Sequence, residues 1–174
     1  MKIQPQANPE LTELAALIEP MSVAMMTNTD EDGALASRPM SPLEMDGAGA
    51  IWFFTDLRSA KVEHLRVVNL AFIDEARANY VSLSGRGEIH ADRVHIERLW
   101  TPFAKPWFPD GPGSTNLALL KVVPDTAEVW DAPNSKMVRL FAMAASVVAG
   151  KPVGLGTHAR LSHLSRRTPN SRSA

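Results

Sequence analysis

The stretch Ile51-Trp-Phe-Phe-Thr-Asp-Leu-Arg-Ser-Ala-Lys61 decides how the rest of the chain is interpreted. From Ile51 to Thr55, bulky apolar and β-branched residues follow one another without alternation, which is typical of a strand covered on both faces. Asp56 interrupts this pattern, and Ser59 then stands where a helix N-cap would. The stretch therefore predicts a buried strand, a short turn and a helix that runs from Ser59 to Val68.

The start of this predicted helix has two interpretations. A helix N-terminus leaves backbone N–H groups unpaired and carries partial positive charge, so it can hold a phosphate group. Lys61 would add a full charge in the first turn. An ordinary core strand, a capped helix and a solvated lysine explain the same residues equally well, and both interpretations stay open at this point.

Composition limits the classes of protein to which the chain can belong. Its 174 residues suit one domain, and 45% hydrophobic with 21% charged residues is a globular composition. A net charge of −1 gives no indication of nucleic acid or of an anionic membrane surface as a partner. The absence of cysteine excludes disulfides, Cys-ligated metals and thiol catalysis. The N-terminal segment is polar and no apolar run approaches the roughly 20 residues of a membrane span, so we expect a cytoplasmic protein.

Short strands at hairpin spacing dominate the rest of the chain. We predict a helix that begins at Asn8-Pro9 and buries a stripe of apolar residues. A hairpin follows, and Pro39 forces its second strand to an edge or a bulge. The further predicted elements are strands at Ser22–Thr29, Ala34–Met40, Leu70–Asp74, Tyr80–Ile89, Leu117–Val123 and Thr126–Asp131, a short helix from Asp92 to Trp100, and a helix over Met137–Ala149.

This order of elements predicts a mainly β fold, with an antiparallel sheet closed into a barrel and flanked by helices. Two glycines in the strand Tyr80–Ile89 indicate a bend or bulge. We expect a single domain over residues 1–161 and a disordered tail over residues 162–174, which is rich in Ser and Arg.

Arg38 is the first candidate for a binding residue. It lies in a strand that should come near Ile51–Thr55 if consecutive strands pair, and so could converge with Ser59 and Lys61. A guanidinium and an ammonium group together suit a phosphate monoester. The alternative is an exposed arginine on the outward face of its strand.

Aromatic residues are the second group of candidates, because flat apolar side chains can enclose a planar ring system. For Trp52 and Trp100 we favour core packing, whereas Trp107 lies in a loop rich in Pro and Gly. The five histidines show no metal-ligand spacing, and no serine occupies a nucleophile elbow. We therefore assign no metal ligands and no catalytic residues.

Taken in order, four motifs resemble one protein family. They are Arg38-Pro39-Met40, Ile51–Asp56 with Ser59 and Lys61, Trp107-Phe108-Pro109-Asp110-Gly111, and Ala127-Glu128-Val129-Trp130-Asp131. From Leu11 to Gly150 the chain resembles the general stress protein 26 branch of the pyridoxamine 5′-phosphate oxidase-like flavoproteins.

The resemblance implies a split β-barrel that binds FMN, in preference to FAD or F420, at a homodimer interface. Arg38 and Lys61 would hold the FMN phosphate, with help from Ser59. Trp107 and Trp130 would reach the site from the partner subunit or cover its mouth. The remaining implied contacts to the ring or the ribityl chain are Pro39, Met40, Phe54, Thr55 and Tyr80.

By this resemblance the protein is an oxidoreductase that passes electrons through the flavin to a small molecule. The Arg-x-His motif by which true pyridoxamine phosphate oxidases hold their substrate is missing, since His158-Ala159-Arg160 has the reverse order. We therefore do not expect that particular oxidase activity. The alternatives are a flavin-binding protein without turnover and a stress-related interaction protein whose aromatic loop is a partner surface.

Overall fold

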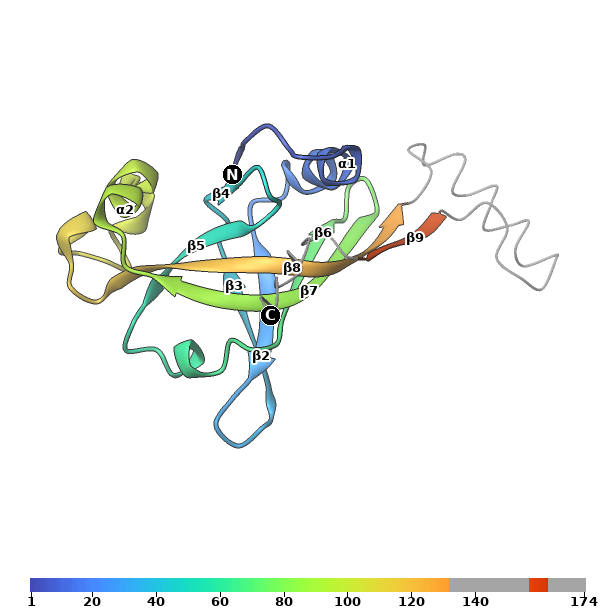
Figure 1. Ribbon diagram of the computed structural model, residues 1–174. Helices are drawn as coiled ribbons and strands as arrows, with labels where there is room; N and C mark the ends of the chain where they lie inside the picture. The colour runs from blue at the N-terminus through green and yellow to red at the C-terminus, as the bar shows by residue number, and fades with distance from the viewer. Residues whose placement is uncertain (132–156, 163–174) are drawn as a thin grey trace, which may run out of the picture.

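One mixed β-sheet with two α-helices makes up the computed structural model, which describes residues 1–131 and 157–162 (Figure 1). The α-helices are α1 (Pro9–Ile18) and α2 (Arg93–Leu99), and single 3₁₀ turns lie at Ala60–Glu63 (η1), Pro102–Ala104 (η2) and Gly111–Gly113 (η3). The strands are β1 (Lys2–Ile3), β2 (Ala24–Thr29), β3 (Leu35–Met40), β4 (Glu44–Met45), β5 (Ile51–Asp56), β6 (Val68–Asp74), β7 (Asn79–His90), β8 (Leu117–Asp131) and β9 (Thr157–Ser162). In the described part of the chain, neither α-helix is long and apolar enough to cross a membrane.

The strands are ordered β1-β4-β5-β8-β7-β6-β2-β3, and β9 pairs with β8. All pairs are antiparallel except β1 with β4. Among the described residues no hydrogen-bonded ladder joins β3 back to β1, so the prediction of a closed barrel is wrong for the hydrogen-bonded sheet. The prediction of a mainly β, mostly antiparallel fold is confirmed.

Two long strands form the backbone of this arrangement. In Figure 1, β7 and β8 cross the molecule side by side, with α2 and its loop at one end and β9 at the other. β8 pairs with β5 through its first half and with β9 through its second half. The molecule therefore has two distinct ends, which we call the α2 end and the β9 end.

The main core lies between the sheet and α1. Asn8 caps α1 through its side-chain oxygen, which accepts a hydrogen bond from the Leu11 N–H at 2.8 Å. The predicted apolar stripe of this helix is buried, and Phe53 and Phe72 are among the largest side chains that it helps to enclose. A smaller core around Trp52 and Ile96 packs α2 against β5 and β8.

Most predicted strands are confirmed, and two elements need correction. The predicted strands Leu117–Val123 and Thr126–Asp131 are one continuous strand, β8. The helix predicted over Ser59–Val68 is only the 3₁₀ turn η1, after which the chain enters β6. β9 was not predicted, and the helix predicted over residues 137–149 lies outside the described residues, as does the tail after residue 162.

Candidate functional site

Arg38 lies on the inward face of the β2–β3 hairpin. In register, Ala24 lies opposite Met40 and Met26 opposite Arg38, so the arginine is in the row of side chains that faces the core. The side chain is half-buried, and its Nη1 donates a hydrogen bond to Oδ1 of Asn28 at 2.6 Å. Arg38 is therefore not the exposed arginine of an outward strand face.

Lys61 belongs to the short turn η1, immediately after β5. Ser59 occupies the N-cap position but makes no side-chain capping bond, and a four-residue 3₁₀ turn is no α-helix with a macrodipole. The phosphate-binding helix end, which was one of the two interpretations of this segment, is therefore absent from it. What remains at this place is the charge of Lys61 itself, on a half-buried side chain.

Arg38 and Lys61 lie close enough to affect each other electrostatically. Burial and the nearby Arg38 guanidinium lower the pKa of Lys61, and Asp56 partly opposes this change. The charged form of Lys61 is therefore disfavoured by desolvation and by the like charge of Arg38. A bound anion would relieve both costs.

Asp56, the carboxylate that acts on Lys61, is already engaged. Arg58 donates to Asp56 from Nε at 3.0 Å and from Nη2 at 2.6 Å, and these bonds lower the pKa of Asp56 to about 2. Within residues 1–131 and 157–162, neither Arg38 nor Lys61 forms an ion pair within 4.0 Å. Their two charges therefore have no ion-pair partner in the described part of the chain, which suits the binding of an external anion.

Thr55 lies in β5, the strand that precedes η1, and has a polar atom without a partner among the described residues. Its side chain is 1% exposed, and its Oγ1 has no hydrogen-bond partner in the described structure. A buried hydroxyl without a partner costs about 1–3 kcal/mol, so such atoms usually meet a ligand or water. The donor or acceptor that Thr55 lacks is thus one that a ligand can provide.

An aromatic group borders the same end of β5. The Phe54 ring lies 5.7 Å from the Trp100 ring and 6.1 Å from the Phe108 ring, measured between centroids. Trp100 and Phe108 come from the end of α2 and the loop that follows it, and both pack on the smaller core. Core packing of Trp52 and Trp100 is thereby confirmed. Because successive side chains of a strand point to opposite faces, this aromatic group lies on the other face of β5 from Thr55.

Some predicted site residues lie elsewhere in a single chain. Pro39 is exposed, Met40 packs on the main core, and Trp107 is 73% exposed in the α2 loop. Tyr80 and Trp130 face each other across β7 and β8 at the β9 end. Because β6 pairs with Asn28 at Val68 and with Tyr80 at Ile73, the Asn28 and Tyr80 positions are separated by roughly 17 Å of strand.

Two features of the structure were not predicted from the sequence: the burial of Asn28 and an ion pair between Glu44 and Arg98. Asn28 is 2% exposed and lies in the inward row of β2, where the pattern Ala24, Met26, Asn28 places a polar residue at a core position. That interruption of an apolar row was the available signal. The second contact is the ion pair between Glu44 and Arg98, which carried no sequence signal because its partners are far apart in the chain.

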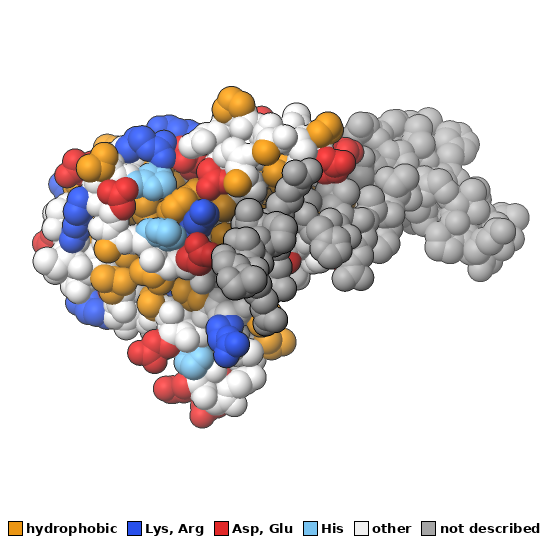
Figure 2. All heavy atoms as spheres, viewed as in Figure 1, with side chains coloured by type: hydrophobic (Ala, Val, Ile, Leu, Met, Phe, Trp, Pro, Cys, Tyr) orange, Lys and Arg blue, Asp and Glu red, His pale blue; other side chains and the backbone are white. Residues whose placement is uncertain are grey.

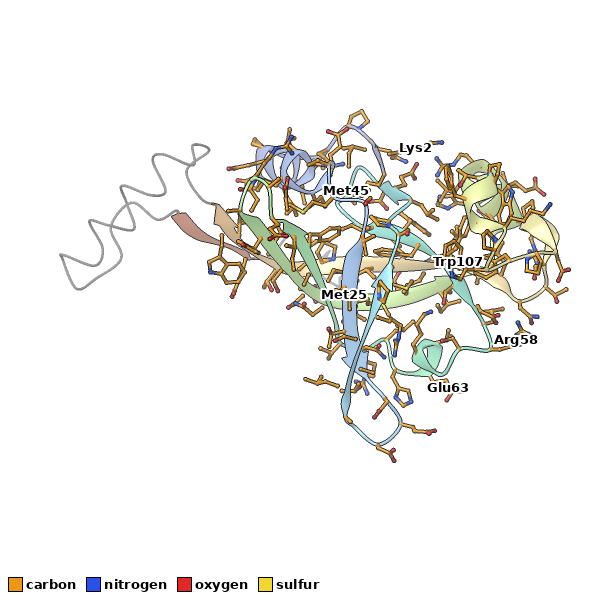
Figure 3. The ribbon with its side chains drawn as sticks, turned by 180° about the vertical axis from the view of Figure 1, so that it is seen from behind. Lys2, Met25, Met45, Arg58, Glu63 and Trp107 are labelled. Carbon is orange, nitrogen blue, oxygen red and sulfur yellow. The ribbon has the colours of Figure 1, made fainter. Side chains whose placement is uncertain are left out.

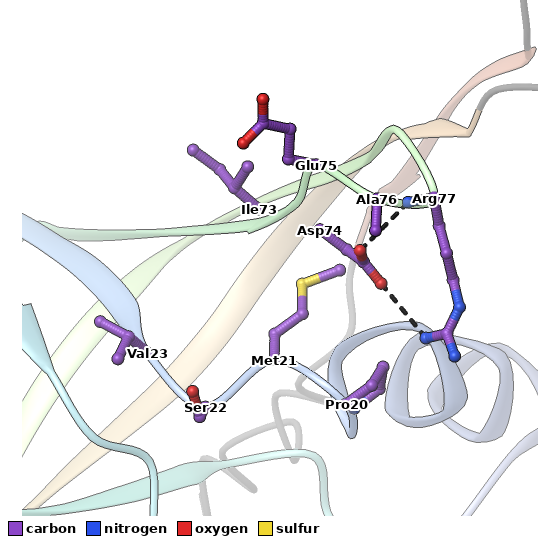
Figure 4. A pocket seen from close by; sticks show the side chains of 9 residues that line it. All are labelled: Pro20, Met21, Ser22, Val23, Ile73, Asp74, Glu75, Ala76 and Arg77. Carbon is purple, nitrogen blue, oxygen red and sulfur yellow. Dashed lines mark hydrogen bonds and ion pairs between the residues drawn. The ribbon is translucent and has the colours of Figure 1, made fainter.

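A separate hollow lies on the surface of the described residues. The hollow has a volume of about 490 Å³ and lies between the start of β2 and the β6–β7 turn, with Met21, Val23 and Ile73 as its apolar side (Figure 4). The Asp74–Arg77 ion pair at its rim is closed on itself at 3.2 Å. On the face shown in Figure 2, acidic and basic side chains alternate around patches of apolar ones.

Three comparisons relate this chain to known proteins. The family model described as "Pyridoxamine 5'-phosphate oxidase like" matches residues 9–153. A solved structure of the general stress FMN/FAD binding protein from Xanthomonas citri is 31% identical, with a TM-score of 0.61 over 74% of this chain and 92% of that one. A Clostridium acetobutylicum protein related to general stress protein 26 is 26% identical, with a TM-score of 0.61 over 70% of this chain and 87% of that one. Protein bli-3 of Neurospora crassa is 25% identical over 82% of this chain and 75% of its own length.

Proposed function

Because this chain belongs to the pyridoxamine 5′-phosphate oxidase-like family, we propose that it binds FMN and acts as an FMN-dependent oxidoreductase on a small molecule. The observation that carries this proposal is the pair of half-buried cations, Arg38 and Lys61, whose charges have no ion-pair partner among the described residues. A phosphate monoester carries close to two negative charges at neutral pH, which matches them.

Two further residues that the family resemblance implies as cofactor contacts lie on β5. Thr55 offers a buried hydroxyl without a partner among the described residues, and Phe54 packs against Phe108 on the opposite face of the strand. When bound, FMN would supply the hydride or electron transfer, whereas the protein supplies binding, orientation and electrostatics. This division explains why the described residues need no acid–base pair of their own at the site.

A second copy of the chain completes the proposal. The outward face of the β2, β6 and β7 strands carries the apolar side chains Met25, Ile73 and Tyr80, which are 37%, 58% and 43% exposed. The outward face of an antiparallel sheet is normally polar, and an apolar face of this kind marks an interface. A homodimer through this face would bring residues of the β9 end, such as Tyr80 and Trp130, toward a partner's site.

Titration with FMN tests the phosphate site. Lys61→Ala and Arg38→Ala should each weaken FMN binding by about 10- to 100-fold, the value of one charge-assisted hydrogen bond, and the double variant should take up no FMN. Lys2→Ala is the matched control, because Lys2 is exposed and lies across the molecule from Glu63 in η1 (Figure 3). Unchanged FMN affinity in the double variant would sink the assignment of the phosphate site.

Rapid-mixing reduction tests the oxidoreductase half of the proposal. Protein loaded with FMN should be bleached by NADH or NADPH and should regain its yellow colour with an acceptor. A flavin that stays oxidised with either nicotinamide would instead support a flavin-binding protein without turnover. Protein that takes up no flavin after reconstitution would favour a role in protein interaction.

A further inference from the structure

We propose that Asn28 is the positioning residue that fixes Arg38 and Lys61 relative to each other as one phosphate-binding unit. This inference rests on the proposed function. Asn28 lies on β2, Arg38 on β3 and Lys61 on η1. A single buried amide group connects the two elements that carry the cations.

The connection consists of three hydrogen bonds. Oδ1 of Asn28 accepts from the Arg38 guanidinium at 2.6 Å, and Nδ2 donates to the carbonyl oxygens of His64 at 3.1 Å and Thr29 at 2.7 Å. His64 is the C-cap of η1, and its N–H donates back to the Lys61 carbonyl oxygen at 3.1 Å. The position of Lys61 is therefore tied to that of Arg38 through one side chain.

The orientation of the Asn28 amide is dictated by its partners. Reversing it would turn N–H donors toward the guanidinium and an oxygen toward two carbonyl oxygens, which leaves every one of these groups unsatisfied. An aspartate could accept from Arg38 but could not donate to the carbonyl groups, and its charge would compete with a phosphate. The site thus needs one acceptor and two donors on a short side chain, which is the chemistry of asparagine.

The burial of Asn28 increases the effect that we expect from losing its hydrogen bonds. Asn28 is 2% exposed, so its three bonds form in surroundings where an unsatisfied polar group is costly. Arg38 lies in the inward row beside Met26 and has no ion-pair partner in the described structure. Without Asn28, the guanidinium loses the hydrogen bond that holds it toward Lys61 and gains freedom to move away.

Comparing FMN with riboflavin separates positioning from general stability, because riboflavin has the same ring and chain without the phosphate. Asn28→Ala should weaken FMN binding by about 10-fold, as expected for one hydrogen bond to a charged group, and leave riboflavin affinity within about twofold. In an Arg38→Ala background, Asn28→Ala should have little further effect on FMN binding, since the two residues act together.

Two further variants keep the test decisive. Asn28→Asp retains the size and polarity of the side chain and should also weaken FMN selectively, even if the alanine variant does not fold. Asn79→Ala is the matched control, because Asn79 is a buried asparagine at the β9 end. This control should lower the melting temperature without changing the ratio of FMN to riboflavin affinity.

The outcomes distinguish the inference from the function on which it depends. Wild-type protein that binds no FMN would overturn both. Wild-type protein that binds FMN through Arg38, together with Asn28 variants that lose FMN and riboflavin equally or additively with Arg38→Ala, would overturn the positioning role alone.

Discussion

Glu44 is an almost fully buried carboxylate, with 3% of its side chain exposed. Arg98 of α2 binds it through two nitrogens at 2.7 and 2.8 Å, and the Gln4 amide donates at 2.9 Å. The hydrogen bonds and charge of Arg98, together with His95, lower the pKa of Glu44 below its usual value of 4.5, against the effect of burial. This ion pair connects α2 to the β4–β5 hairpin. It thereby also holds the loop after α2, which carries Phe108.

We predict that Arg98→Met lowers the free energy of unfolding by about 2 kcal/mol at pH 7, because it leaves a buried carboxylate without its main partner. The estimate is below that of a fully buried pair, since Arg98 is 47% exposed. Arg58→Met is the matched control: its pair with Asp56 is similarly short but 72% exposed on the arginine side, so urea midpoints should hardly change.

The same pair should govern stability in acid. Because folding lowers the pKa of Glu44, the carboxylate stabilises the folded state above pH 4.5, and this contribution disappears as pH falls through the lowered folded value. The stability difference between wild type and Arg98→Met should therefore be largest near pH 7 and shrink as pH falls, because burial raises the pKa of Glu44 once Arg98 is gone and protonation then removes the unpaired buried charge. A difference that persists unchanged at pH 3 would contradict the ionic origin of the effect.

At the scale of elements, Gly85 sets the register of the two longest strands. The β7–β8 ladder shifts between Ser84 and Gly85, where Gly85 lies opposite Pro124. A Cβ added to Gly85 would overlap the Val123 carbonyl oxygen and the Pro124 Cα. This close backbone approach is the reason for the bulge that the glycine pair predicted.

Gly85→Ala should lower the free energy of unfolding by about 2–3 kcal/mol, because the strands must separate locally to admit the methyl group. Gly113→Ala, where an added Cβ meets nothing within 4 Å, should be neutral within error. Chemical denaturation of both variants measures the difference. Equal midpoints for the two would show that the β7–β8 approach is looser than described.

The two elements predicted wrongly show where local sequence stops being informative. Pro124-Asp125 resembles a turn, yet Pro124 is accommodated within β8 because it lies at the bulge made by the distant Gly85. Ser59 resembles a helix cap, yet the segment after η1 departs toward β6, which β2 and β7 hold in the sheet. In both cases a pairing remote in sequence overrode a correct local preference.

The candidate site likewise contains some residues whose role could be predicted from the sequence and others whose role could not. The proximity of Arg38 and Lys61 was predicted from the pairing of consecutive strands, but β3 pairs only with β2 in the sheet and not with β5, so the two cations come close by another route. Asn28 could not be assigned a role, because it depends on the β2–β3 register and on the path of the chain after η1. The pairing of Glu44 with Arg98 likewise follows only from the docking of α2.

At the scale of the whole molecule, the two ends of the sheet have different characters. The α2 end holds the aromatic group and the buried Thr55, whereas the outward face toward the β9 end carries apolar side chains in adjacent rows: Ile73 lies opposite Tyr80, and Tyr80 opposite Trp130. Water contact with such a row costs about 25 cal/mol for each Å² of apolar surface. Association of two copies through this face would remove that cost. The resulting dimer would contain the α2 end and the β9 end of both copies.

We predict that wild-type protein is a dimer by light scattering coupled to size exclusion, and that Ile73→Glu with Tyr80→Glu converts it to a folded monomer. The reason is that two charges placed in an apolar interface of two-fold symmetry meet their own copies or lose water without a partner. Val94→Glu is the matched control, because Val94 is 75% exposed on α2 and lies outside this face. Circular dichroism would verify that the monomer is folded, and FMN titration would then show whether one subunit suffices for binding. A double variant that remains dimeric, or a wild type that binds FMN as a monomer, would rule out this face as the interface that completes the site.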